Sequence, residues 1–556
     1  MAVKKRLLLV DDDDTLREEL VAQFALYEEF ETTDVATATA GIEAAKATPF
    51  DLIILDVDLP DMLGTEACQL MRAADVAAPI VMLTGNDGDM NEILGLNSGA
   101  NDYVTKPFRF AVLLARLRAH LRSFEQSEDA IFQVGPYEFA RSMQALSGQI
   151  HVGDRLISEE ALADAAQRAG GADVLINRHI HVRDLADERI RSVTAPNNDT
   201  LYTSAVLEMS QTPVRLIVPE HGERYLSIAL MDMFTDQRMV GAHGRKGAPG
   251  EYLIIGPDSP LEDGPFVIRM LSNDAWLLAR TFVAGVEDLE AARQVQSGIS
   301  VEPVDPEVQP RRFITRAPAD MEPESFLALT NEVLGRSPGH PQVDRSAHFI
   351  RKGIVPGRIN AWEDLSLGAR LAWSRWLPRA LPRVRQGLSR TQSRMGWNTP
   401  PVILGDYGEN DVVRAAIALI GFGALRTEDA RYFRTETDEA GEELNGAKTY
   451  QMVIPSEGVP VEAFWSLSLY EPDADGRLFF YETPLDRHSI NSGSSDLVRA
   501  ADGSIALQLS RERPTSDGIV WIPTPAGKFE AIFRTYEPQE AVIVGSWSVP
   551  PIERIH

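Results

Sequence analysis

The sequence predicts a multidomain protein with an α/β domain at its N-terminus and mainly β structure in the remainder. Its 556 residues favour several domains over one large core. Between Lys5 and Arg122, short apolar runs alternate with amphipathic helical stretches, which is typical of a doubly wound parallel sheet. From Leu175 onward, short alternating strands are interrupted by Pro, Gly and Asn or Asp turns, which predicts antiparallel β structure.

The N-terminal domain is expected to span residues 5–123 and to contain a flavodoxin-like sheet of five parallel strands. Three of the strand candidates are almost wholly apolar, as strands covered on both faces must be. The predicted strands are Arg6–Val10, Glu31–Ala36, Leu52–Leu55, Ile80–Leu83 and Asp102–Val104, and the predicted helices include Leu16–Tyr27, Ile42–Ala47 and Phe110–Ser123.

Changes in composition divide the rest of the chain. We expect a linker with a short helix over 124–174 and a first β-rich domain over 175–300. A Pro-rich and helical connector follows over 301–395, and a second β-rich domain over 396–556. The sequence shows no evident internal repeat.

Composition narrows the possible functions. The 54 Lys and Arg against 82 Asp and Glu give a net charge of -28, which argues against nucleic acid or an anionic membrane as the main partner. Cys68 is the only cysteine, which excludes intrachain disulfides and multi-cysteine metal sites. The apolar run near the N-terminus is too short for a signal peptide or a membrane span. We therefore expect a cytoplasmic protein.

Polar residues follow the predicted parallel strands, where ligands bind in sheets of this kind. Asp11 and Asp12 end the first strand, Asp56 the third and Thr84 the fourth, and Lys106 follows the fifth. Converging carboxylates suit Mg²⁺, which neutralises a phosphoryl group while one carboxylate attacks it. Lys106 would pair with a phosphoryl oxygen, and Thr84 would donate its hydroxyl to another. The pattern predicts a site for phosphoryl transfer.

Four segments carry a resemblance to a known family. They are VDDDD (10–14), DLIILDVDLPDMLG (51–64), VMLTGND (81–87) and GANDYVTKPF (99–108), and they resemble the CheY-like receiver domain of bacterial two-component response regulators. The resemblance implies that a sensor histidine kinase phosphorylates Asp56. It also implies Mg²⁺ ligands from Asp12, Asp56 and the backbone carbonyl of Asp58, with Asp11 acting through the water shell of the metal.

The same resemblance assigns the switch and a dimer face. Thr84 and Tyr103 would be the switch pair, and Lys106 the phosphoryl-binding lysine. Segments 99–108 and 110–122 resemble the OmpR-type subfamily, which implies a homodimer on phosphorylation. Asp102 and Arg116 match one ion pair across that dimer, whereas Glu92 and Val112 stand where the family usually carries another.

The segment FQVGPYEF (132–139) resembles the opening strand of the OmpR-type winged-helix domain. No recognisable continuation of that domain follows Phe139, so the segment is expected to be a remnant. The output of the receiver is therefore expected not to bind DNA. A DNA-binding transcriptional regulator stays open as an alternative.

The C-terminal region resembles two bacterial domains of unknown function, numbered 1254 and 1214. The segments NRHIHVRDL (177–185), APNNDTLYTSAVLEMS (195–210) and VPEHGERYLSIALMDMFTDQ (218–237) resemble the first, and YGENDVVRAAIALIGFGAL (407–425), AFWSLSLYE (463–471) and IPTPAGKFEAIFRTYEP (522–538) the second. The resemblance implies two sandwich or jelly-roll domains with a helical insertion between them. It implies no activity.

Two loops of the first β-rich domain suggest a polar pocket. One holds Asn198 and Asp199, and the other holds Asp232 and Asp236. If the loops meet, they could bind a small ligand or act as an enzyme site. The alternative is that residues 197–199 simply form an Asx-type turn.

Overall fold

The computed structural model describes residues 5–118, with gaps at 28, 49, 75, 77 and 86–99. It also describes residues 175–555, with gaps at 192–193, 242–247, 316–321, 388–392, 400–402, 409, 421, 475 and 486–487. The chain forms two compact units, Met1–Ala130 and Ile131–His556. In the described part of the chain, no helix is both long and apolar enough to cross a membrane.

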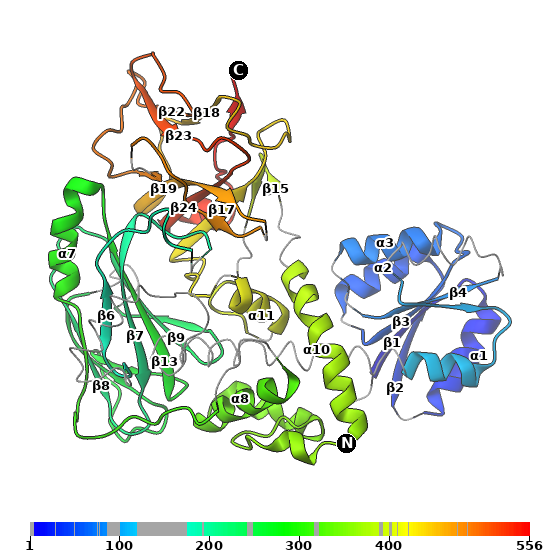
Figure 1. The fold of residues 1–556 in the computed structure, drawn as a ribbon. Helices are drawn as coiled ribbons and strands as arrows, with labels where there is room; N and C mark the ends of the chain where they lie inside the picture. The colour runs from blue at the N-terminus through cyan, green and yellow to red at the C-terminus, as the bar shows by residue number, and fades with distance from the viewer. Residues whose placement is uncertain are drawn as a thin grey trace. The chain divides into compact units, whose positions relative to one another are not determined.

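The first unit contains the predicted parallel sheet, drawn in blue in Figure 1. Its strand order is β2-β1-β3-β4-β5, and every residue of β3 and β4 is buried, which confirms the doubly wound fold. The strands are β1 (Lys5–Val10), β2 (Phe30–Val35), β3 (Leu52–Asp56), β4 (Ile80–Thr84) and β5 (Asp102–Thr105), and the helices are α1 (Asp14–Ala25), α2 (Ala38–Ala47) and α3 (Gly64–Ala73), with residues 110–118 also helical.

The second unit begins with a β-sandwich. One sheet, here called the first inner sheet, has the order β10-β9-β13-β7-β6, and the other has the order β12-β11-β8-β14. Leu230 and Leu277 from the inner sheet pack with Leu216 and Ile254 from the outer one. The strands are β6 (His179–Val182), β7 (Thr200–Glu208), β8 (Val214–Val218), β9 (Leu226–Asp232), β10 (Gln237–Met239), β11 (Gly250–Ile255), β12 (Val267–Arg269), β13 (Asp274–Phe282) and β14 (Ser300–Pro303). Helix α7 (Leu289–Ser297) lies between β13 and β14.

A helical connector follows, and its last helix lies beyond the range 301–395 expected for the connector. Its helices are α8 (Pro323–Arg336), α9 (Pro341–Arg345), α10 (Leu367–Gly387) and α11 (Asp411–Ile420). The residues of α8 are mostly buried, including Phe326 and Val333. Helix α10 contacts both α8 and α11.

A second β-sandwich ends the chain. The second inner sheet runs β15-β16-β17-β24-β19-β20 with β21 beside β19, and the outer sheet runs β23-β22-β18-β25. Leu467 and Phe533 of the inner sheet share a core with Met452 and Leu507 of the outer one. The strands are β15 (Ser393–Arg394), β16 (Trp397–Asn398), β17 (Ala430–Thr435), β18 (Tyr450–Ile454), β19 (Val461–Pro472), β20 (Leu478–Phe479), β21 (Ser489–Asn491), β22 (Ile505–Ser510), β23 (Ile519–Pro523), β24 (Glu530–Pro538) and β25 (Glu553–Arg554), with a short helix α12 (Glu540–Ile543).

The two sandwiches share one topology. The three central inner strands are β9-β13-β7 in the first and β19-β24-β17 in the second. The outer sheets correspond strand by strand, and each ends in a parallel pair, β11 with β12 and β22 with β23. The sequence shows no evident repeat, but the fold repeats: the two sandwiches share the connectivity of their strands and few of their residues.

The two inner sheets pack against each other (Figure 1). The ring of Phe464 lies 4.1 Å from Phe282 and 5.3 Å from Tyr225, measured between centroids. The side-chain amide of Asn197 donates to the hydroxyl of Tyr536 at 2.9 Å. Each inner sheet is thus covered on both faces, by its own core and by the other sandwich.

Candidate functional site

Three carboxylates and a lysine meet at the carboxyl edge of the parallel sheet. Asp11, Asp12 and Asp56 each offer a carboxylate oxygen, and these atoms lie within 4.8 Å of one another. The ammonium group of Lys106 is 2.8 Å from Asp56 Oδ1 and 2.9 Å from Asp11 Oδ2. Asp11 and Asp56 are buried, whereas Asp12 is exposed. The structure thus brings these four predicted residues together.

The protonation of this cluster follows from burial and from the ion pairs. Burial raises the pKa of the Asp56 carboxyl; the bond from Lys106 opposes this rise and the nearby Asp11 carboxylate adds to it. Burial lowers the pKa of Lys106, but its two carboxylate partners raise it by more, so the lysine stays charged. One ammonium group cannot balance three carboxylates, so oxygen ligands and excess negative charge suit a divalent cation such as Mg²⁺.

The backbone beside Asp56 leaves no room for a side chain at Gly64. A Cβ atom there would lie 2.0 Å from the carbonyl oxygen of Asp56. Asp58 pairs with Leu63 in an isolated bridge, which closes the turn after β3. The turn therefore holds the peptide groups of residues 56–58 close to the carboxylate cluster.

The two predicted switch residues lie on neighbouring strands. Thr84 ends β4 and is buried. Tyr103 on β5 is partly buried, and its hydroxyl donates to the sulfur of Met82 at 3.0 Å. The ring is thus held against β4 at Met82, two residues before Thr84.

A surface depression of about 320 Å³ adjoins the lysine. It lies between helix α1 and the segment that follows β5. It is lined by Asp13, Thr15, Leu16, Glu19, Lys106, Pro107 and Phe108.

The predicted dimer residues pair within the chain. Arg116 Nη1 lies 2.9 Å from both carboxylate oxygens of Asp102. Val112 is exposed, and Glu92 lies outside the described residues.

The four residues of the predicted output pocket do not meet. The backbone carbonyl of Asp199 accepts from Val283, just after the end of β13, while Asp232 is in register with Ala275 near its start. Eight residues of extended strand span roughly 26 Å. The single-pocket expectation is therefore wrong, because the two loops lie at opposite ends of the sheet.

Each loop instead joins a separate buried network. The side chain of Asn197 accepts from the backbone of Asp199 at 2.8 Å, which is the Asx-type turn. The Asp199 carboxylate accepts from Ser489 at 2.9 Å and from Asn491 at 3.2 Å. The side chain of Asn198 donates to the carbonyl of Ala186.

At the other end of the sheet, Asp232 accepts from His340 Nε2 at 3.1 Å and from the backbone of Asp236 at 3.1 Å. Asp236 pairs with Arg414 at 2.8 Å. Burial, together with the Asp232 carboxylate, raises the pKa of Asp236 to about 6, against the opposing effect of Arg414.

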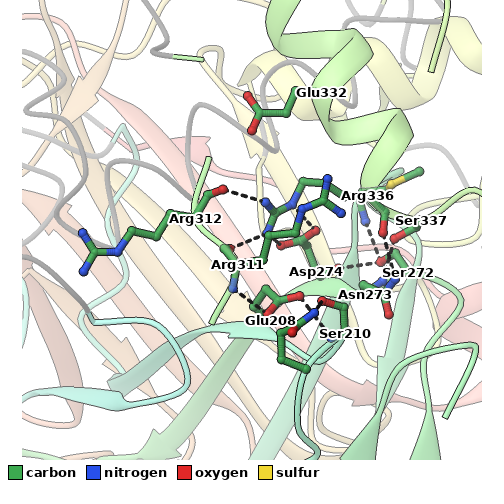
Figure 2. A network of polar contacts seen from close by, with 12 residues as sticks. Glu208, Ser210, Ser272, Asn273, Asp274, Arg311, Arg312, Glu332, Arg336 and Ser337 are labelled. Atoms are coloured by element: carbon green, nitrogen blue, oxygen red, sulfur yellow. Dashed lines mark hydrogen bonds and ion pairs between the residues drawn. The ribbon is translucent and has the colours of Figure 1, made fainter. Parts of the chain in front are cut away.

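A further charged network, not predicted from the sequence, joins α8 to the first sandwich (Figure 2). Arg336 and Asp274 form two hydrogen bonds of 2.6 Å, and both side chains are buried. Arg336 also donates to the carbonyls of Arg311 and Arg312, at 2.8 and 3.1 Å. Glu208 accepts from the backbone of Arg311 at 2.9 Å. The charge of Arg336 is therefore paired within the chain, and the network fixes α8 to the first sandwich.

Comparison with known proteins shows which proteins the N-terminal part of the chain is similar to. A model of the response regulator receiver domain matches residues 7–118. The DNA-binding response regulator MtrA of Mycolicibacterium smegmatis is 35% identical over 198 residues, which are 34% of this chain and 85% of that protein. The chain belongs to the response regulator family. The transcriptional regulatory protein CseB of Streptomyces avermitilis is 41% identical over 125 residues, or 22% of this response regulator and 52% of CseB.

The alignment with MtrA is longer than the receiver. It covers 34% of this response regulator, more residues than the chain holds up to position 118, so it continues into the segment after the receiver. The expectation that the winged-helix-like segment does not continue after Phe139 stays a prediction. That segment lies outside the described residues.

The β-rich unit of this response regulator matches two models of proteins of unknown function, DUF1254 over residues 176–303 and DUF1214 over 429–540. The VPA0106 protein of Vibrio parahaemolyticus is similar in structure, with a TM-score of 0.57 and 18% identity over 78% of this chain and 99% of that protein. Because the match covers 78% of this chain, most of the matched residues belong to the β-rich unit. At this identity the likeness shows the fold alone.

Proposed function

We propose that a sensor histidine kinase phosphorylates this response regulator on Asp56 and that the phosphoryl group controls the β-rich unit. The observation that carries the proposal is the contact of Lys106 with both Asp56 and Asp11 inside a cluster of three carboxylates. Phosphoryl transfer depends on positioning and on charge stabilisation, and these groups supply both.

The chemistry follows from the residues at the edge of the sheet. A carboxylate oxygen of Asp56 forms a bond to phosphorus while the bond from phosphorus to the kinase histidine breaks. Lys106 then pairs with a phosphoryl oxygen, and Thr84 donates its hydroxyl to another. Asp11, Asp12, Asp56 and the carbonyl of Asp58 would hold Mg²⁺, which when bound neutralises charge on the phosphoryl oxygens.

Acetyl phosphate with Mg²⁺ tests the acceptor on a phosphate-affinity gel. We expect the full chain to shift and Asp56→Asn not to shift. Asp14→Asn is the matched control, because Asp14 is an exposed aspartate of the same acidic run with no place in the cluster. Equal labelling of wild type and Asp56→Asn would contradict the proposal.

Control of the β-rich unit is tested by hydrogen exchange on the full chain. Phosphorylation of the wild type should change exchange in residues 175–555, and the same treatment of Asp56→Asn should not. Changes confined to residues 5–118 would show that the receiver does not act on this unit.

DNA binding is a second candidate, favoured by the alignment with the DNA-binding protein MtrA beyond the receiver. It predicts binding to duplex DNA that weakens steeply with salt, in proportion to the phosphate contacts made. Fluorescence anisotropy with labelled duplex at low salt measures this. Unchanged anisotropy with phosphorylated protein would leave the β-rich unit as the output.

A further inference from the structure

The duplicated fold repeats a row of three side chains across each inner sheet. In each row an arginine on the central strand has a tyrosine as its register partner on one side and a serine on the other. Register partners point to the same face of a sheet, so the three side chains are neighbours. The first row is Tyr202, Arg280 and Ser227, and the second row is Tyr432, Arg534 and Ser466.

The sequence around the rows also repeats. Each arginine is followed by a threonine and an aromatic residue, and each tyrosine follows an aspartate by three positions. After each aromatic residue, a backbone N–H donates to the carbonyl of that aspartate, from Val283 to Asp199 at 2.8 Å and from Glu537 to Asp429 at 2.9 Å. The rows are therefore equivalent places in two copies of one fold.

The two rows face each other across the packed inner sheets. Burial raises the pKa of Tyr432 in the second row, and Arg280 of the first row acts against that rise, which requires the two to be close. Tyr225, which precedes β9, contacts Tyr536 of β24 with 5.6 Å between ring centroids. Arg280 and Arg534 are only 5% and 3% exposed. The seam, defined by these two rows, thus contains two buried guanidinium groups.

The two arginines differ in how many of their N–H groups have a hydrogen-bond partner. Arg534 donates to Ser468 at 2.9 Å, to the hydroxyl of Tyr470 at 2.7 Å and to a backbone carbonyl at 3.2 Å. Within the described part of the chain, Arg280 makes one hydrogen bond, from Nη2 to the carbonyl of Gly423 at 2.6 Å, and its buried Nη1 has no hydrogen-bond partner.

Arg280 also lacks a counter-charge. Its strongest electrostatic interactions are with four tyrosines, and among the described residues no carboxylate lies within ion-pair distance. Arg336 shows the contrast, since that buried arginine has both carboxylate oxygens of Asp274. The guanidinium group of Arg280 lies 5.7 Å from the centroid of the Tyr202 ring, so its partners are an aromatic face and one carbonyl rather than an anion. A buried charge without a counter-charge is unfavourable, so an anion bound at Nη1 would be stabilised here.

Three hydroxyl groups in or beside the seam also have no hydrogen-bond partner among the described residues. The side-chain oxygens of Ser227, Tyr225 and Ser466 are buried without hydrogen-bond partners. Ser227 lies beside Tyr225, and Ser466 lies beside Asp199, without a well-formed hydrogen bond in either pair. The hydroxyls of Ser227 and Tyr225 add donors near Arg280, whereas that of Ser466 lies beside Arg534 in the second row.

We propose that the seam between the two sandwiches is a binding site for a small organic monocarboxylate, with Arg280 as its anchor. Arg534 lies near the Asp199 carboxylate, so Arg280 is the guanidinium group of the seam that lacks a nearby carboxylate. One such positive charge matches one carboxylate, whereas a phosphate dianion would bring a second negative charge into a buried site. The rings of Tyr225, Phe464 and Tyr536 form the apolar surroundings, which suit a flat apolar body such as an aromatic ring.

Titration calorimetry of the full chain with benzoate, acetate and inorganic phosphate tests this. We expect one benzoate per chain, weaker binding of acetate, and no binding of phosphate. Arg280→Gln keeps a donor but removes the charge, so it should weaken benzoate binding at least tenfold. Arg215→Gln is the matched control, because Arg215 is a half-exposed arginine on the outer sheet of the same sandwich.

Thermal unfolding followed by fluorescence is a second measurement, and it does not depend on the heat of binding. All eight tryptophans lie at or after position 276, so their fluorescence follows the β-rich unit alone. Benzoate should raise the midpoint of the wild type and of Arg215→Gln, but not of Arg280→Gln. Ser227→Ala removes one hydroxyl from the seam and should reduce the shift while keeping the fold.

Three outcomes overturn the proposal. Equal benzoate binding by wild type and Arg280→Gln would place the ligand elsewhere. Tighter binding of phosphate than of benzoate would refute the monocarboxylate class. A complete lack of response to all three anions would mean that Arg280 is balanced by water alone.

Discussion

Replacing Asp274 by Asn is expected to destabilise the β-rich unit by about 3 kcal/mol. The side chains of Asp274 and Arg336 are 3% and 2% exposed and share two hydrogen bonds of 2.6 Å. Breaking a buried pair by removing one partner costs roughly 3 to 5 kcal/mol, because the other charge is left uncompensated. Asn keeps the shape and one acceptor, and Glu208 stays close to Arg336, so we expect the lower end of this range.

Urea unfolding followed by tryptophan fluorescence measures the change, since it reports the free energy of unfolding of this unit. Glu251→Gln is the control: it breaks the exposed pair with Arg215, which contributes about 0 to 1 kcal/mol. Without ligand, Arg280→Gln should have the opposite sign and stabilise, because it removes a buried charge that has no partner. The reasoning is refuted if Asp274→Asn loses no more than the control does.

Three further predictions concern other sites. Gly64→Ala should unfold or shift the turn beside Asp56 and abolish labelling by acetyl phosphate, since a Cβ would lie 2.0 Å from the Asp56 carbonyl oxygen; normal labelling would show that the turn can move. The pKa of Asp236 is raised to about 6, so its favourable contribution is complete below about pH 4 and is lost as the pH rises through about 6. Urea unfolding at both pH values should therefore show the wild type losing stability relative to Asp236→Asn; parallel curves would contradict this. Arg116→Ala should leave labelling intact but prevent the homodimer of phosphorylated protein that the OmpR-type resemblance implies. Light scattering measures this, and an unchanged dimer mass would exclude this face.

The receiver could be predicted from sequence because its geometry leaves little choice. Strands covered on both faces must be apolar throughout, as β3 and β4 are. Residues that follow parallel strands meet at one edge, so Asp11, Asp56 and Lys106 had to lie close together. The contact between Asp102 and Arg116 within the chain was not predicted, because the resemblance places that pair across a dimer.

The β-rich unit was less predictable because antiparallel sheets depend on register. Motif order does not tell which end of β13 a loop reaches, so Asp199 and Asp232 could not be separated from sequence. Arg280 stands inside the mostly apolar strand β13. A charged residue within such a strand was the available signal, and its repetition at Arg534 becomes visible only once the strands are superimposed by topology.

The duplicated sandwich has a consequence for how the β-rich unit behaves in solution. Two equivalent sandwiches on separate chains would part on dilution, as any dimer does. On one chain their encounter is intramolecular, with an effective concentration set by the connector. The stability of the unit should therefore not depend on protein concentration. The two halves can also diverge independently, so that one arginine gains internal partners while its counterpart keeps a free donor.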